Sequence, residues 1–284
     1  MSLRYKSLVQ WFAIPRPVQV TVAFLGLISL SGLTHAEADA SYWQAMQKDF
    51  FPNKTLQQSA EIEITAPKRA ESGAQVPFAF SIASPMTAAS YIKSVSVIAD
   101  ANPVPLVAVY HFNPSSGKAE VSTRIRLEVD SLVHVVAETS DGKFLVNQVA
   151  IRASGGCGGT IGSDEDAARQ TAGKMKLQVK PQPAEAESRN NASIKQAHLL
   201  IKHPMNTGLQ RDLVSQGYRP AFYISKVTAR FNDQVVFDAD TYIGVSEDPS
   251  IQFPFKAEQS GQLTLLIEDN EGKQFSTSTE VMVN

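Results

Sequence analysis

The chain has 284 residues, of which 19% are charged and 43% belong to the hydrophobic set, so it is not a disordered tail protein. Its 26 basic and 28 acidic side chains nearly cancel, which gives no electrostatic case for nucleic acid or an anionic membrane surface as a partner. With a single cysteine, the chain also cannot form an internal disulfide.

The N-terminus has the order of a secretory signal peptide. Basic residues precede an apolar stretch at 18–30, and small residues follow it up to Ala36. A membrane span needs about 20 apolar residues, whereas this stretch is shorter and is interrupted by Gln19 and Thr21. We therefore expect removal of residues 1–36, export to the periplasm, and no membrane association of the mature protein.

The first half of the mature chain has the pattern of a short helix followed by strands. Residues 41–51 have apolar side chains at helical spacing, with Tyr42, Trp43, Met46 and Phe50 on one face. Short runs rich in β-branched and aromatic residues follow, separated by turn residues. They predict strands at 61–66, 76–82, 91–99, 104–112, 119–128, 131–138 and 144–152. This pattern is typical of an immunoglobulin-like sandwich, which we assign to residues 37–154.

A glycine-rich segment, 155–173, separates this half from a second one. Acidic residues at 164–166 are typical of the start of a short helix, so the segment is expected to be a partly helical tether. Further runs predict strands at 175–180, 194–202, 221–231, 234–238, 251–256, 262–268 and 275–283. The expected fold is therefore all-β, with a second immunoglobulin-like sandwich at 174–284.

The cysteine, Cys157, lies between Gly155, Gly156, Gly158 and Gly159. Glycines carry no side chain that could cover the sulfur, and they leave the backbone flexible. The pattern predicts an exposed thiol on an arm that enters a narrow cleft of another protein. An ordinary cysteine has a pKa of ~8.5, so part of it is thiolate at neutral pH. An unshielded thiol would also allow a disulfide-linked homodimer, whereas the alternative interpretation is a linker with an incidental cysteine.

Histidines provide two further candidate sites, each with an ordinary alternative. His203 and Met205 are ligand types found in copper centres, with His198 as a further donor, but the set is incomplete. His111 or His134 could act as the base of a cysteine hydrolase. Such a base has to be held rigidly within hydrogen-bond reach, and ordinary strand positions explain both residues. We predict neither a metal site nor a catalytic residue.

Charged residues near the cysteine have candidate roles as well. Arg124, Arg126 and Arg152 could form a face that attracts anions, but solvent-facing strand positions explain them equally well. The acidic residues at 164–166 place negative charge close to the thiol, and such charge disfavours the thiolate.

Several motifs identify a family. In the first half, Ala66-Pro67, Glu71–Pro77, Asn102–Pro105 and the Gly-Gly-Cys-Gly-Gly at 155–159 resemble SoxY, the sulfur-carrier subunit of the periplasmic thiosulfate-oxidation system. The second half resembles SoxZ through motifs at His203–Leu209, Pro220–Ile224, Gly244–Pro249 and Glu268–Gly272. Together the motifs span nearly all of the mature chain. Their order resembles the fused SoxYZ-like carriers associated with quinoprotein alcohol dehydrogenases.

The resemblance implies a non-enzymatic carrier without a cofactor. Cys157 would hold a sulfur-containing group, such as a persulfide or a thiosulfonate, and present it to sulfur-oxidising or quinoprotein dehydrogenase-system proteins. The two halves would contact each other within the chain. In the separate carrier the cysteine motif ends the chain, whereas here domains fix it at both ends. Two alternatives remain, an assembly module for a quinoprotein dehydrogenase that acts through a mixed disulfide, and a cysteine-dependent enzyme.

Overall fold

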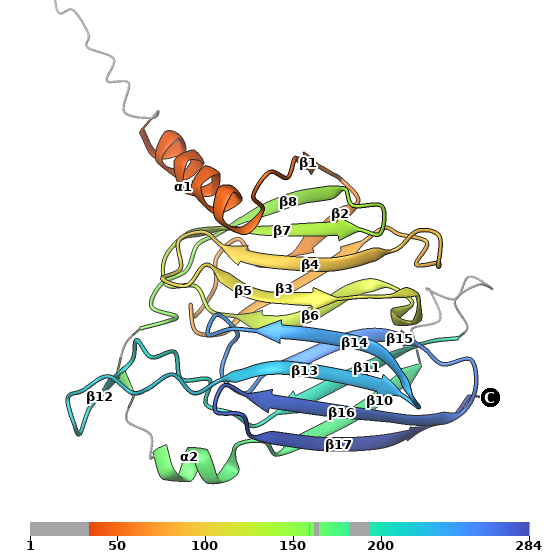
Figure 1. The fold of residues 1–284 in the computed structure, drawn as a ribbon. Coiled ribbons are helices and arrows are strands. Elements are labelled where there is room, and N and C mark those ends of the chain that lie inside the picture. Colours follow the sequence, from red (N-terminus) through yellow and green to blue (C-terminus); the bar gives the residue numbers. More distant parts are fainter. Residues whose placement is uncertain (1–33, 159, 162–164, 182–192, 284) are drawn as a thin grey trace, which may run out of the picture. The chain divides into compact units, whose positions relative to one another are not determined.

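A computed structural model describes residues 34–158, 160–161, 165–181 and 193–283 (Figure 1). The predicted signal peptide lies outside these residues, except for its last three positions. Across the part of the chain that is described, no helix is long and apolar enough to cross a membrane.

The predicted strands are present in both halves. The first half contains β1 (Leu56–Gln58), β2 (Ile62–Thr65), β3 (Val76–Ile82), β4 (Ile92–Ala99), β5 (Leu106–His111), the short helix η1 (Pro114–Ser116), β6 (Ala119–Ile125), β7 (Ser131–Thr139) and β8 (Phe144–Ile151). The tether contains β9 (Thr160–Ile161) and α2 (Glu165–Thr171). The second half contains β10 (Met175–Pro181), β11 (Ile194–Ile201), β12 (Arg211–Asp212), β13 (Ile224–Phe231), β14 (Gln234–Thr241), β15 (Ser250–Lys256), β16 (Gly261–Asp269) and β17 (Gln274–Val281). Of the strands in the described residues, only the short ones β1, β9 and β12 were not predicted.

The predicted N-terminal helix is α1, which spans Thr34–Phe50 and so begins earlier than expected. Met46 is buried, and the ring of Trp43 stacks on that of His134 with 3.7 Å between the ring centroids. Tyr42 and Phe50, by contrast, are exposed. Only part of the predicted apolar face therefore packs against the strands.

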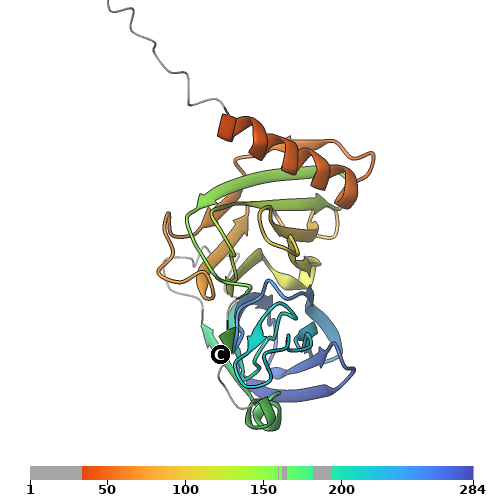
Figure 2. The ribbon, with the colours of Figure 1, turned by 90° about the vertical axis from the view of Figure 1, so that its left-hand side faces the viewer.

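The two immunoglobulin-like sandwiches share both of their sheets. One sheet has the order β1-β8-β7-β4-β5-β14-β13-β16-β17, and the other has the order β10-β11-β15-β6-β3-β2. The halves join where β5 pairs with β14 in an antiparallel register from Ala108–Thr241 to His111–Asp238. They join again where β6 meets β15 at Ser122–Gln252. Figures 1 and 2 show this meeting of first-half strands, orange to green, with second-half strands, teal to blue. The expected contact between the halves is confirmed.

Alternation along the strands builds a core that is continuous across this junction. In β3, for example, every second residue from Val76 to Ile82 is buried. Tyr110 and Phe112 of the first half contact the ring of Phe237 in the second half, with ring centroids 6.1 and 6.3 Å apart. Phe237 in turn stacks on Phe253 at 4.2 Å. We therefore expect the two halves to unfold together.

Substitution of Phe237 by leucine tests this expectation. It should lower the free energy of unfolding by about 1–2 kcal/mol, since an aromatic contact on both sides of the junction is lost. Hydrogen exchange through global unfolding should accelerate equally in β4 and β16. The matched control is Phe50→Leu at an exposed position, which should alter neither the free energy of unfolding nor the exchange rates in β4 and β16. Faster exchange in β16 alone would show that the halves unfold separately.

Candidate functional site around Cys157

The sulfur of Cys157 is buried, with 2% of the residue exposed. The prediction of an unshielded thiol is therefore wrong for this conformation. The segment packs against the loop that follows β6. The amides of Gly155 and Gly156 donate to the carbonyls of Glu128 at 2.7 Å and Leu127 at 3.0 Å. A disulfide between two copies would first require the segment to leave this position.

Gly156 and Gly73 allow their backbones to approach each other closely. A Cβ at Gly156 would lie 2.2 Å from the carbonyl oxygen of Gly73 and 2.5 Å from that of Leu127. A Cβ at Gly73 would lie 2.5 Å from the carbonyl oxygen of Ser154. Contacts this short with backbone atoms exclude any side chain. In the docked segment, glycine at position 156 thus serves close packing, while Gly159 lies outside the described residues.

Substitution of Gly156 by alanine should undock the segment. Its Cβ would clash with backbone, and a cost of about 1.4 kcal/mol already shifts an equilibrium tenfold. We expect alkylation of Cys157 at neutral pH to accelerate by about tenfold or more. The matched control is Gly158→Ala, whose Cβ would make an ordinary contact of 3.4 Å with the Glu128 carboxylate. Equal rates of Cys157 alkylation in the two variants would contradict the role of Gly156 in close packing.

The carboxylate of Glu128 holds the cysteine backbone. Its Oε2 accepts the amide of Cys157 at 2.6 Å and that of Gly158 at 2.9 Å. Asn102 in turn fixes the strand end, because its Oδ1 accepts the amide of Glu128 at 2.9 Å and its Nδ2 donates to the carbonyl of Arg126 at 2.8 Å. The motif that begins at Asn102 thus positions the residues that contact the cysteine.

Arg126 joins the cysteine segment to the second half. It is 3% exposed, so its interpretation as a solvent-facing strand residue is wrong. It directly follows Ile125, the last residue of β6. Its guanidinium donates to three carbonyls, those of Gly156 at 3.1 Å, Val245 at 3.3 Å and Met205 at 3.4 Å. One buried cation therefore connects three chain segments.

The second half holds the cysteine segment from the other side. The hydroxyl of Thr207 donates to the carbonyl of Cys157 at 2.7 Å. Beyond the cysteine, β9 pairs in parallel with β12. In α2, the Arg169 guanidinium contacts the Glu271 carboxylate at 2.9 and 3.0 Å and lies 4.2 Å from the ring centroid of Phe222. The described part of the tether is thus anchored on both halves.

Burial and charge at this site disfavour the thiolate. Burial, and secondly the negative charge of Glu128, raise the pKa of Cys157 to about 11, although Arg126 acts in the opposite direction. The expected source of negative charge was the acidic run at 164–166, but its position 164 lies outside the described residues. Among the described side chains, Glu128 supplies negative charge next to the thiol. The docked thiol is therefore protonated at neutral pH.

The candidate copper ligands have other roles. Nδ1 of His203 accepts the amide of Met205 at 3.1 Å, and the ring lies 4.4 Å from that of Phe222. Burial lowers the pKa of His203 to about 4, so the ring is neutral. His198 bonds with the Ser250 hydroxyl instead. Among the described residues, no group of three or more histidine, cysteine, aspartate or glutamate side chains could hold a metal ion.

The candidate hydrolase bases are also engaged elsewhere. His111 pairs with Asp240 across the β5–β14 junction, with 2.9 Å between Nε2 and Oδ2. His134 is fully buried under Trp43. Within the described ranges, the interactions of Cys157 involve Arg126, Glu128 and Thr207, and no histidine. This arrangement does not supply a general base to the thiol.

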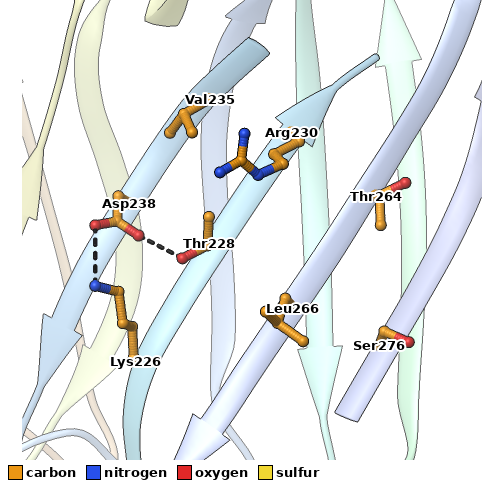
Figure 3. A pocket seen from close by; sticks show the side chains of 8 residues that line it. All are labelled: Lys226, Thr228, Arg230, Val235, Asp238, Thr264, Leu266 and Ser276. Carbon is orange, nitrogen blue, oxygen red and sulfur yellow. Dashed lines mark hydrogen bonds and ion pairs between the residues drawn. The ribbon is translucent and has the colours of Figure 1, made fainter. Parts of the chain in front are cut away.

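A separate hollow of about 490 Å³ lies over β13, β14, β16 and β17 (Figure 3). Its lining residues are Lys226, Thr228, Arg230, Val235, Asp238, Thr264, Leu266 and Ser276. The Asp238 carboxylate is engaged by Lys226 and Thr228, and Arg230 donates to the carbonyl of Asp233 at 3.1 Å. Since its charged groups already have partners and no cysteine lines it, the Cys157 site is the better candidate.

Two family models match the chain. The model described as sulfur oxidation protein SoxY matches residues 47–157, and the one described as sulphur oxidation protein SoxZ matches residues 183–280. Cys157 is the last residue of the first match. Among curated proteins, the sequence search found no match.

Solved structures resemble parts of the chain. The sulfur carrier protein SoxY from Chlorobium limicola f thiosulfatophilum is 28% identical, with 42% of this chain and 98% of that one covered and a TM-score of 0.36. A superoxide reductase (neelaredoxin) from Ignicoccus hospitalis is 14% identical, with 35% and 94% covered and a TM-score of 0.32. A putative superoxide reductase from Thermotoga maritima is 15% identical, with 35% and 95% covered and a TM-score of 0.31. No activity is transferred from the reductases to this chain.

Proposed function

Because the chain belongs to the SoxYZ-like proteins, with a SoxY and a SoxZ domain in one polypeptide, we propose that it is a covalent carrier of a sulfur-containing group on Cys157. One observation supports this most strongly. The cysteine ends the matched SoxY region and lies where residues of both domains contact its backbone, Glu128 from one and Thr207 from the other. Cys157 thus lies where residues of both domains meet, which supports a carrier role for it.

The carrier would work by leaving this position. In the docked state the thiol is buried and protonated, which protects it from oxidation and from stray alkylation. Once undocked, it would regain an ordinary pKa of ~8.5 and a reactive thiolate fraction. Cargo bound covalently to the chain cannot diffuse away between partner enzymes, which raises its effective concentration at each of them.

The cellular setting is part of the proposal. The basic, apolar and small-residue order of the N-terminus supports export to the periplasm. The resemblance to fused carriers supports partners in sulfur oxidation or in a quinoprotein dehydrogenase system. We assign no catalytic role to the chain itself, because the carrier residue lacks a positioned base among the described side chains.

The intact mass of protein purified from its own cells without reductant tests this function. We expect additions that correspond to sulfur atoms or sulfur oxyanions, lost on treatment with a thiol and absent from a Cys157→Ser control. A disulfide from Cys157 to another protein would favour the assembly module. A cysteine that stays unmodified while the pathway is active would contradict the carrier role.

A further inference from the structure

Glu128 acts on the cysteine in two opposite ways. Its Oε2 accepts the amides of both Cys157 and Gly158, so the carboxylate fixes the segment in its docked position. The same negative charge disfavours a negative charge on the sulfur of Cys157. Glu128 therefore holds the backbone of Cys157 in place and at the same time disfavours the thiolate form of that residue.

The nearby cation does not cancel this effect. Arg126 attracts a negative charge on the sulfur, but its N–H groups donate to three carbonyls, and Glu247 competes for its charge. Burial of Cys157 adds a cost for any ion, because charge is poorly solvated there. The combined environment favours an uncharged sulfur.

We propose that Glu128 is a positioning residue that makes docking depend on the charge of the sulfur. An uncharged thiol stays docked, whereas an anionic sulfur group on Cys157 leaves the site. The inference rests on the proposed carrier function and adds its regulation. Loading with an anionic cargo, such as a persulfide or a thiosulfonate, displays that cargo to a partner, and unloading returns the thiol to its protected position.

Linkage sets the size of the effect. Docking suppresses ionisation by some factor, and by reciprocity a negative charge weakens docking by the same factor. The docked environment raises the pKa of the thiol to about 11, which is about two units above that of an ordinary thiol. Each pKa unit is a factor of ten, so one negative charge at the sulfur shifts the docking equilibrium by up to ~100-fold.

Two reagents that add groups of similar length to Cys157, one neutral and one anionic, distinguish the effect of charge on docking from the effect of size. The full chain is treated with hydroxyethyl or sulfonatoethyl methanethiosulfonate. In both cases the thiolate attacks the reagent's sulfenyl sulfur, a disulfide bond forms, and methanesulfinate leaves with the electrons of the broken sulfur–sulfur bond. The product is neutral in one case and anionic in the other. Hydrogen exchange at the amides of residues 155–158 then reports docking, because Glu128 and Leu127 hold these amides in the docked state.

In the wild type we expect faster exchange in the anionic adduct than in the neutral one, by up to ~100-fold. Glu128→Gln keeps an oxygen acceptor but removes the charge, so the difference between the adducts should become smaller, while the part that burial causes remains. The matched control is Asp130→Asn, which removes a nearby carboxylate that accepts the amide of Ala153 at 3.0 Å and makes no bond to Cys157. This control should retain the difference.

Three results would overturn the inference. Equal exchange of the two wild-type adducts would mean that size alone undocks the segment, and this comparison requires no variant to fold. An undiminished difference in Glu128→Gln, or a smaller one in Asp130→Asn, would show that the charge of Glu128 does not contribute to it. Because the adducts are synthetic, these results do not depend on the cellular cargo. A failed mass test of the carrier role would likewise leave them unchanged.

Discussion

Substitution of Arg126 by alanine is expected to lower the free energy of unfolding by about 3–5 kcal/mol. The change leaves the carbonyls of Gly156, Val245 and Met205 without their donor, and an unsatisfied buried acceptor costs about 1–3 kcal/mol. Chemical denaturation measures the loss. Alkylation of Cys157 should accelerate in the same variant, because one bond that holds the segment is gone.

A neighbouring arginine provides the control for this prediction. Arg124 is half-buried, and its guanidinium donates to the Gln75 side chain at 3.2 Å. Its replacement by alanine should change stability by no more than about 0.5 kcal/mol. The stability of Arg126→Lys should lie between those of the two alanine variants, because lysine keeps the charge but lacks the planar guanidinium that donates to three carbonyls. Equal stability of the two alanine variants would contradict the junction role of Arg126.

Cys157→Ser is expected to abolish function completely. Serine has no accessible thiolate and forms neither a persulfide nor a disulfide, so no cargo is bound. The measurement is complementation of a strain that lacks the chain. Full complementation by the serine variant would exclude the carrier role.

The same variant should also lose some stability, because the thiol is buried and not exposed as the sequence predicts. An exposed cysteine could be replaced at no cost, but at a residue that is 2% exposed the added hydroxyl requires a partner. We expect a loss of about 1–2 kcal/mol. Cys157→Ala adds no hydroxyl and separates the loss of the thiol from the burial of a polar group, so it should fail complementation with a smaller loss of stability.

The strands could be predicted because alternation of apolar residues is a local signal. Every predicted run contains a strand, whereas β1, β9 and β12 are only two or three residues long and depend on pairing partners elsewhere in the chain. Sharing of the sheets was not predictable in the same way. The pairing of β5 with β14 joins residues more than 120 positions apart, and nothing in either run specifies its neighbour.

The identity of the cysteine site could be predicted, but its burial could not. The four adjacent glycines predict an exposed thiol, whereas the segment is held in its buried position by Leu127, Glu128 and Thr207, which are remote in sequence. Arg126 was missed because its position fits an exposed strand residue. The SoxZ-like motifs contained a signal for the role of Arg126. The motif that begins at His203 and the one that begins at Gly244 lie in loops rather than strands, and both contact Arg126.

The most direct test of the docked thiol is a titration of its thiolate absorbance in the wild type, with Cys157→Ser as the blank. Since docking raises the pKa, docking is strongest while the thiol is protonated and weakens as the pH rises above the ordinary value of ~8.5. We expect a midpoint well above the ordinary value and at most at the docked value of about 11, because ionisation itself weakens docking. A midpoint at the ordinary ~8.5 would show an exposed thiol on a free linker and would contradict it.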